Sequence, residues 1–233
     1  MSIATVYLIP TFLHENTTYA LPPSIFASAE KCTTLFVENE RSARRFLKQL
    51  KKEIVIDHFE WFTIGKAEAD VLQTFRKKIK ENTTVGIISE AGCPGVADPG
   101  QLLIAAAQEL GATVVPLVGP SSILLALMAS GMSGQQFSFT GYLPIDNHQR
   151  IKAIKELEAE SKKKNATQIF IETPYRNNQM LETLLKHCQA STRLCVASNI
   201  TAPDEYIKTK TIQQWKAEQI DLHKKPTIFL LKS

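Results

Sequence analysis

The sequence predicts an α/β protein of two α/β domains, the first built on a mostly parallel sheet and the second on a mixed sheet. In the first half, short apolar runs alternate with amphipathic segments. These runs are continuously apolar, which is typical of strands buried on both faces of a helix-covered parallel sheet. In the second half, two strand-like runs at 192–200 and 206–211 are joined by the short turn "TAPDE", which predicts an antiparallel hairpin.

The first half supplies five expected strands and four expected helices. Phe46 and Leu50 lie four residues apart, as on one helix face, and Val71, Phe75 and Ile79 form a similar stripe. Strands are expected at 4–10, 33–39, 58–64, 84–89 and 112–118. Helices are expected at 24–32, 42–53, 67–82 and 101–110.

The domain boundary is expected at 117/118, which gives domains 1–117 and 118–233. The stretch "VGPSSILLALMASG" there opens a helix, with Ser121 as its N-cap and Gly131 just past its end. Strands of the second domain are expected at 137–144, 167–173, 192–200, 206–211 and 226–232. Helices are expected at 149–160, 175–187 and 211–219.

Composition narrows the class of protein. The chain has 233 residues and a formal net charge of +4, with basic blocks that are either solvated helix faces or parts of an RNA-facing surface. No C-x-x-C pair, secretory leader or membrane-length apolar run is evident, which predicts free thiols, no zinc site and a cytoplasmic protein. The four cysteines are Cys32, Cys93, Cys188 and Cys195.

Two glycine- and proline-rich loops follow strands. The first, "GIISEAGCPGVADPG" at 86–100, is either a preorganised ligand cradle or a tight strand-to-helix connection without a ligand. The second, "VGPSS" at 118–122, either lines the same site or only caps the following helix. Neither loop contains a P-loop motif, and no G-x-G-x-x-G opens the first helix, which argues against a phosphate or classical dinucleotide site.

These loops resemble the tetrapyrrole methylase superfamily of S-adenosylmethionine-dependent methyltransferases. The most specific match is "SEAGCPGVADPG" followed by "VGPSS". Further matches are "VENERSARRFLKQL" (37–50), "FSFTGYLP" (137–144) and "FIETPYRNNQMLETL" (170–184). Within the superfamily, the sequence is most similar to the branch that methylates a ribose 2′-hydroxyl of small-subunit ribosomal RNA.

The resemblance implies a homodimer and S-adenosylmethionine in a cleft between the two domains, and the scattered histidines predict no metal site. The implied cofactor contacts are Pro10, Gly92, Cys93, Pro94, Val96, Ser121, Ser122, Glu172, Ser198 and Pro226. Arg41, Arg44 and Tyr142 either contact an RNA phosphate or base, or serve only in surface salt bridges and core packing.

Removal of the acceptor proton requires a base near the methyl group, and the candidates are Glu38, Glu90 and Asp98. Structural roles stay open for each: Glu90 as a cap of loop amides, Asp98 as a cap of the helix at 101, and Glu38 as a partner of Arg41 or Arg45. Three functions also stay open. They are a ribosomal-RNA ribose methyltransferase, a methyltransferase of the same fold with a small-molecule acceptor, and a cofactor-binding interaction module without catalysis.

Overall fold

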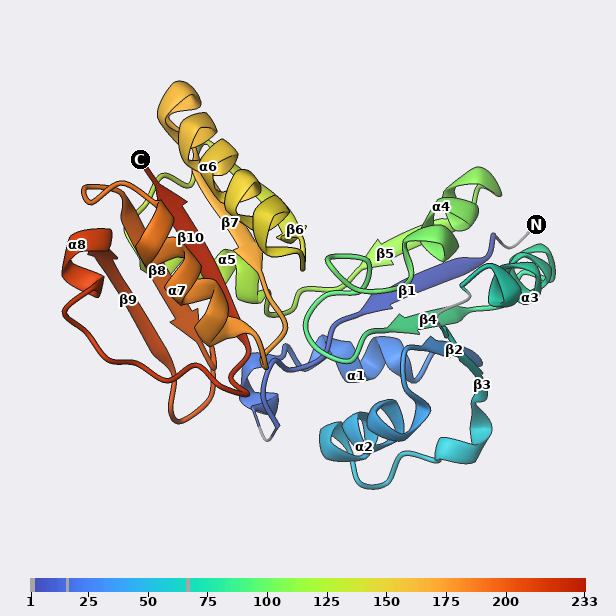
Figure 1. Cartoon of the computed structure of the whole chain (residues 1–233). Coiled ribbons are helices and arrows are strands. Elements are labelled where there is room, and N and C mark those ends of the chain that lie inside the picture. Colours follow the sequence, from blue (N-terminus) through green and yellow to red (C-terminus); the bar gives the residue numbers. More distant parts are fainter. Residues whose placement is uncertain (1–2, 16, 66–67) are drawn as a thin grey trace. The chain divides into compact units, whose positions relative to one another are not determined.

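The computed structural model describes residues 3–15, 17–65 and 68–233 (Figure 1). The chain divides into two compact units, Met1–Ser121 and Ser122–Ser233, each with its own sheet. Both units contain helices and strands, so the predicted pair of α/β domains is confirmed.

The first unit contains a five-stranded parallel sheet. Its order is β3-β2-β4-β1-β5, and every neighbouring pair is parallel, as predicted. The strands are β1 (Thr5–Ile9), β2 (Thr34–Val37), β3 (Glu60–Thr63), β4 (Val85–Ile88) and β5 (Thr113–Pro116).

Helices cover both faces of this sheet. They are α1 (Ser24–Ala29), α2 (Glu40–Leu50), α3 (Glu68–Lys80) and α4 (Gln101–Glu109). One core joins Ile25 and Phe46 of α1 and α2 to Leu35 of β2. A second core on the opposite face joins Phe75 of α3 and Leu103 of α4 to the strands. Burial of both sheet faces explains why the strands read as unbroken apolar runs.

Helix boundaries differ from the expected ones for local reasons. The helix α2 begins at Glu40, before the expected Ser42, because the Asn39 side chain accepts a hydrogen bond from the Ser42 amide at 3.2 Å. It ends at Leu50 because Lys51 is extended. The helix α3 spans Glu68–Lys80, and position 67 of the expected helix lies outside the described residues.

The strand order places a topological switch point between β2 and β4, at the carboxyl ends of these strands. After β2 the chain runs outward to β3, whereas after the neighbouring β4 it runs in the opposite direction to β5. In open α/β sheets, ligands bind at such a switch point, outside the carboxyl ends of the strands. The loops after β2 and β4 are therefore the expected position of a site.

The second unit contains a mixed five-stranded sheet of order β6-β7-β10-β8-β9. Its strands are β6 (Phe137–Tyr142), β7 (Thr167–Ile171), β8 (Arg193–Ser198), β9 (Tyr206–Thr211) and β10 (Thr227–Lys232). Only β6 and β7 are parallel among its pairs. Arg193 faces Thr211 and Ser198 faces Tyr206, which confirms the predicted hairpin of β8 and β9.

The helices of the second unit are α5 (Ser122–Ser130), α6 (Asn147–Lys164), α7 (Asn177–His187) and α8 (Ile212–Trp215). The main core contains Phe170 stacked on Phe229, with ring centroids 5.7 Å apart, and the fully buried Trp215. The Trp215 indole donates to the Leu194 carbonyl at 2.8 Å. The α8 helix is a single turn, shorter than the predicted 211–219, and a Thr211–Gln214 capping box opens it.

Candidate functional site

Three loops at the carboxyl ends of β1, β4 and β5 are bound to one another. The Thr11 amide donates to the Gly92 carbonyl at 2.9 Å, which joins the loop after β1 to the loop after β4. The Cys93 thiol lies 3.5 Å from the Pro120 carbonyl oxygen, to which it donates, and this contact joins the loop after β4 to the loop after β5. The two glycine-rich loops of the sequence therefore lie side by side.

Two glycines are required for this close approach. Gly92 has φ +79°, in the left-handed region, and a Cβ there would lie 3.3 Å from Leu13 and 3.4 Å from the Pro120 oxygen. A Cβ on Gly119 would lie 2.3 Å from the ring of Pro10, which no real contact allows. Both positions would strain with any larger residue.

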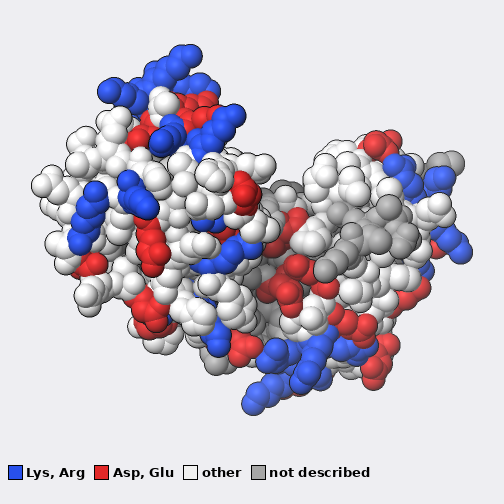
Figure 2. Space-filling view, in the orientation of Figure 1, with Lys and Arg blue, Asp and Glu red and all other residues white. Residues whose placement is uncertain are grey.

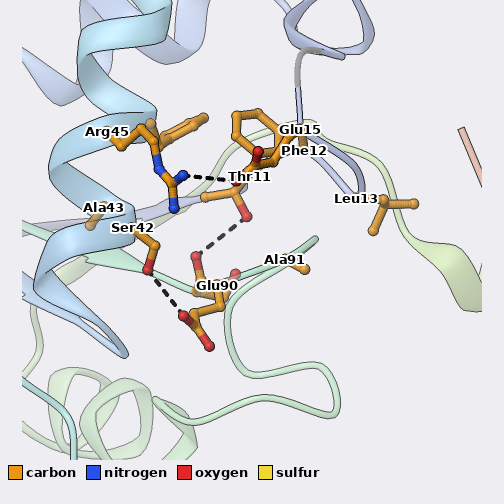
Figure 3. Close-up of a pocket in the computed structure, with 11 residues that line it drawn as sticks. Thr11, Phe12, Leu13, Glu15, Ser42, Ala43, Arg45, Glu90 and Ala91 are labelled. Carbon is orange, nitrogen blue, oxygen red and sulfur yellow. Dashed lines mark hydrogen bonds and ion pairs between the residues drawn. The ribbon is translucent and has the colours of Figure 1, made fainter. Parts of the chain in front are cut away.

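A cavity of about 270 Å³ opens beside these loops (Figure 3). It lies between the loop after β1, the first turns of α2 and the loop after β4. The lining residues are Thr11, Phe12, Leu13, Glu15, Ser42, Ala43, Arg45, Phe46, Ser89, Glu90 and Ala91. Its volume is near the lower limit of ligand cavities, which are roughly 300–1,000 Å³.

Polar side chains at the cavity are held by one another. Ser42 of α2 donates to the Glu90 carboxylate at 3.0 Å, and Thr11 donates to the Ser89 carbonyl at 3.3 Å (Figure 3). Arg45 pairs with Glu15 at 3.0 Å. The wall thus presents a carboxylate and two hydroxyls whose positions are fixed before any ligand arrives.

The three predicted carboxylate residues lie near one another at the switch point. The Glu90 amide donates to Glu38 Oε2 at 3.2 Å, so the residues that follow β2 and β4 are in contact. Burial raises the pKa of Asp98 from 3.8 to about 7, and the negative charges of Glu38 and Glu90 act in the same direction. Asp98 is therefore close enough to both glutamates to interact with them.

The structure shows other partners than those expected if these carboxylates had only structural roles. Gly100, and not Asp98, is the N-cap residue of α4. Arg45 pairs with Glu15 instead of Glu38, and Arg41 forms no ion pair within the described ranges. Glu90 accepts from Ser42 rather than from a loop amide.

The raised pKa of Asp98 predicts a pH-dependent stability. Between about pH 4 and pH 7 the folded state holds this proton and the unfolded state does not, so this group's contribution to stability falls as pH rises. Replacing Asp98 by Asn should raise the free energy of unfolding by about 1–2 kcal/mol at pH 8, less than the full shift implies because solvent screens a partly exposed group. Urea unfolding of both proteins at about pH 4.5 and about pH 8 measures this. Equal differences at the two pH values would contradict it.

Several cavity residues were not predicted from the sequence. Thr11, Ser42, Arg45 and Ser89 line the cavity, whereas the predicted Arg44 pairs with Glu40 at 2.8 Å. The amphipathic pattern of α2 carried a usable signal, because Ser42 and Arg45 flank its buried residues Ala43 and Phe46. Arg44 instead stacks over Trp61, with its guanidinium carbon 4.7 Å from the ring centroid.

In the second unit, the predicted residues lie at the same end of the sheet, where β6, β7 and β8 end and β10 begins. Glu172 follows β7, Ser198 ends β8 and Pro226 precedes β10, and the register places Ile171 opposite Ile228 and Ser198 opposite Thr227. Tyr142 at the end of β6 is opposite Ile171, and its side chain is exposed. The fold thus brings these residues to the same end from four strands.

Glu172 is the most unusual residue at this end of the sheet. Its side chain is 1% exposed, and its Oε1 accepts from Arg176 at 2.6 Å. Its Oε2 is buried and has no partner among the described residues. A buried carboxylate oxygen without a donor is costly, about 1–3 kcal/mol, so the site favours a further hydrogen-bond donor.

Metal and membrane features are absent from the part of the chain that the structure describes. No group of three or more His, Cys, Asp or Glu side chains there is arranged to hold a metal ion. No described helix combines the length and apolar character needed to cross a bilayer.

The chain has two α/β units, and glycine-rich loops meet at the carboxyl ends of the parallel strands of the first unit. These features define a class of two-domain α/β proteins in which such loops are the expected place for a small ligand. Within this class the chain belongs to the tetrapyrrole (corrin/porphyrin) methylase family, whose model matches residues 25–216. The predicted superfamily is confirmed.

Individual relatives agree with this assignment. The ribosomal RNA small subunit methyltransferase I of Vibrio cholerae is 32% identical over 167 residues, which are 70% of this chain and 56% of that relative. The protein of the same name from Halalkalibacterium halodurans is 37% identical over 153 residues, 64% of this chain and 51% of that relative. The chain spans about half the length of the curated relatives it matches.

A solved structure shares the fold over the whole chain. The methyltransferase CobJ superimposes with a TM-score of 0.65 at 18% identity, covering 100% of this chain and 95% of CobJ. At this identity the likeness shows the fold alone.

Proposed function

We propose that this protein is an S-adenosylmethionine-dependent methyltransferase that methylates a ribose 2′-hydroxyl of small-subunit ribosomal RNA in the cytoplasm. The observation that carries the proposal is the grouping of Glu38, Glu90 and Asp98 at the switch point, where Glu90 also lines the cavity. The names of the relatives support the choice of ribosomal RNA.

The residues present fit the cofactor. The Cys93 and Gly95 amides, on the loop after β4, donate to no residue in the described part of the chain, and both residues are partly exposed. Such amides suit the polar groups of a small ligand. Bound S-adenosylmethionine would supply an electrophilic methyl group on sulfur. The contacts proposed for the ten cofactor residues stay predictions; these residues are Pro10, Gly92, Cys93, Pro94, Val96, Ser121, Ser122, Glu172, Ser198 and Pro226.

Asp98 is the group that we assign to proton removal from the acceptor hydroxyl. A general base is most effective when its pKa lies near the working pH, and Asp98 has a pKa of about 7. Burial is the main cause of that pKa, the charges of Glu38 and Glu90 raise it further, and Ser42 orients Glu90. Glu38 and Glu90 are therefore positioning residues in this scheme, and Asp98 is the catalytic residue.

The α2 helix is the part of the first unit that we assign to the RNA backbone. Figure 2 shows Lys and Arg gathered over this helix, whose sequence from 40 to 50 contains Arg41, Arg44, Arg45 and Lys48. Exposed ion pairs such as Arg44–Asp57, at 3.7 Å, are worth little, so a phosphate can replace the carboxylate at small cost. Because Ser42 and Arg45 also line the cavity, the same helix joins the RNA surface to the acceptor site.

The direct test compares small-subunit RNA from cells with and without the gene by a map of 2′-O-methyl groups. We expect one mark to disappear on deletion and to return with the wild-type gene but not with the Asp98→Asn variant. An unchanged map would overturn the RNA acceptor. Transfer of labelled methyl to a metabolite would then identify a small-molecule methyltransferase, and cofactor binding without any transfer would identify an interaction module.

The homodimer implied by the resemblance also stays a prediction. Light scattering of the purified protein at several concentrations measures its mass directly.

A further inference from the structure

An exposed pair of rings occupies the edge of the second unit where β7 ends and β10 begins. Tyr175 is 70% exposed, and its ring lies edge-on to that of His223, with centroids 5.9 Å apart. Neither ring is needed by the core, since both residues are exposed and neither belongs to the buried apolar cluster. Both rings are therefore accessible to a ligand.

The two loops that carry the rings are held rigidly together. The Lys224 amide donates to the Pro174 carbonyl at 3.0 Å, and the Asn177 side chain donates to the Lys225 carbonyl at 2.6 Å. Nearby, the Leu222 amide donates to the Asn178 side chain at 2.7 Å. Because these hydrogen bonds already hold the two loops, the rings lose little conformational entropy when a ligand binds.

Charge around the rings favours an anionic chain. Lys224 is exposed and Lys225 is partly exposed, and their ammonium groups form no ion pair with residues that the structure describes. The nearby Asp221 carboxylate accepts from the Asn178 side chain and the His223 amide and stays negatively charged, so it offsets part of the lysine charge. The nearby Arg176 is paired with the buried Glu172, so the two lysines supply the positive charge that is available to a ligand here.

We propose that Tyr175, His223, Lys224 and Lys225 form a stacking platform for an unpaired stretch of RNA. The proposal rests on the proposed function, since it takes RNA as the substrate class, and it adds a second RNA-binding surface on the second unit. Aromatic rings stack on splayed-out bases, while flanking lysines bind the phosphates between them. A duplex offers no free base face, so the platform selects single strands.

The first test measures RNA affinity by fluorescence anisotropy, without cofactor. The probe is a labelled single-stranded RNA of roughly 12 nucleotides, a length within the range that such surfaces bind. Tyr175→Ala should weaken binding about 5- to 160-fold, because a stacked base contributes about 1–3 kcal/mol, and Tyr175→Phe should restore it. Tyr19→Ala is the matched control, since Tyr19 is an 80% exposed tyrosine of the first unit.

A second measurement reports on the lysines. Replacing Lys224 and Lys225 by Gln should reduce the slope of log affinity against log salt by about 0.7 for each phosphate that the protein no longer neutralises. Lys216→Gln, an exposed lysine at the end of α8, should leave the slope unchanged.

The outcomes separate this proposal from the proposed function. If the wild type binds the single strand and Tyr175→Ala binds it equally well, the platform is wrong and the methyltransferase assignment stands. Equal weakening for the single strand and its duplex would also overturn stacking. If the wild type binds no RNA but binds S-adenosylmethionine, the RNA acceptor itself is wrong, and the platform with it.

Discussion

Replacing Asp98 by Asn is expected to lower the rate of methyl transfer by about 100-fold or more, because a positioned general base contributes roughly 10²–10⁴. The amide has nearly the same shape but cannot accept the proton. Affinity for S-adenosylmethionine should change little, since the cofactor contacts proposed in this loop are made by backbone groups. Single-turnover transfer of labelled methyl and calorimetric cofactor binding measure the two quantities separately.

The pH profile provides the sharper version of this experiment. With a pKa of about 7, Asp98 is protonated in acid, so the wild-type rate should rise with pH through about 7 and then level off. The residual rate of Asp98→Asn should not show this rise. Glu81→Gln is the control, because Glu81 is an exposed carboxylate at the end of α3 whose ion pair is with Lys77. A wild-type rate that does not change between pH 6 and 8, roughly one unit on each side of this pKa, would remove Asp98 from proton transfer.

Replacing Gly92 by Val should weaken cofactor binding about 5- to 160-fold, since a residue forced into the left-handed region costs about 1–3 kcal/mol. The valine would need φ +79°, and its Cβ would press on Leu13 and the Pro120 oxygen. The loop after β4 would then move away from the loops after β1 and β5. Isothermal titration calorimetry with S-adenosylmethionine measures the effect.

The matched control for this variant is Gly111→Val. Gly111 has φ +71°, so the backbone strain is similar, but nothing lies within 4 Å of its Cβ position and it follows α4 away from the loops. It should lower the unfolding free energy without changing cofactor affinity. If Gly92→Val binds S-adenosylmethionine as tightly as the wild type does, the loop after β4 is not part of the cofactor site.

Local sequence patterns were sufficient for most of the fold. The runs "TVGIIS" and "TRLCVASNI" are strands because their β-branched residues suit a pleated, buried surface, and this preference acts within a few residues. The short turn "TAPDE" brought β8 and β9 together for the same local reason. Boundaries such as that of α2 differed because one capping side chain, Asn39, decides where a helix begins.

The sequence was sufficient to predict several residues of the candidate site, but not the contacts between them. Glu38 and Glu90 can be identified one by one, 52 positions apart, but their contact depends on β2 and β4 being neighbours. The pattern of α2 places Ser42 and Arg45 beside its buried face, but their role at the cavity follows from which face of α2 meets the loop after β4. Tyr175 and His223 are joined only through the loops that flank β7 and β10.

By itself, the sequence determined the strands, the helices, the two glycine-rich loops and the family, since these depend on side-chain periodicity and backbone preferences over short distances. The tertiary structure alone decided the order β3-β2-β4-β1-β5, and with it the switch point where three carboxylates interact. The physical reason is that the pKa of Asp98 depends on burial and on charges from distant parts of the chain. Those quantities exist only once the sheet has formed.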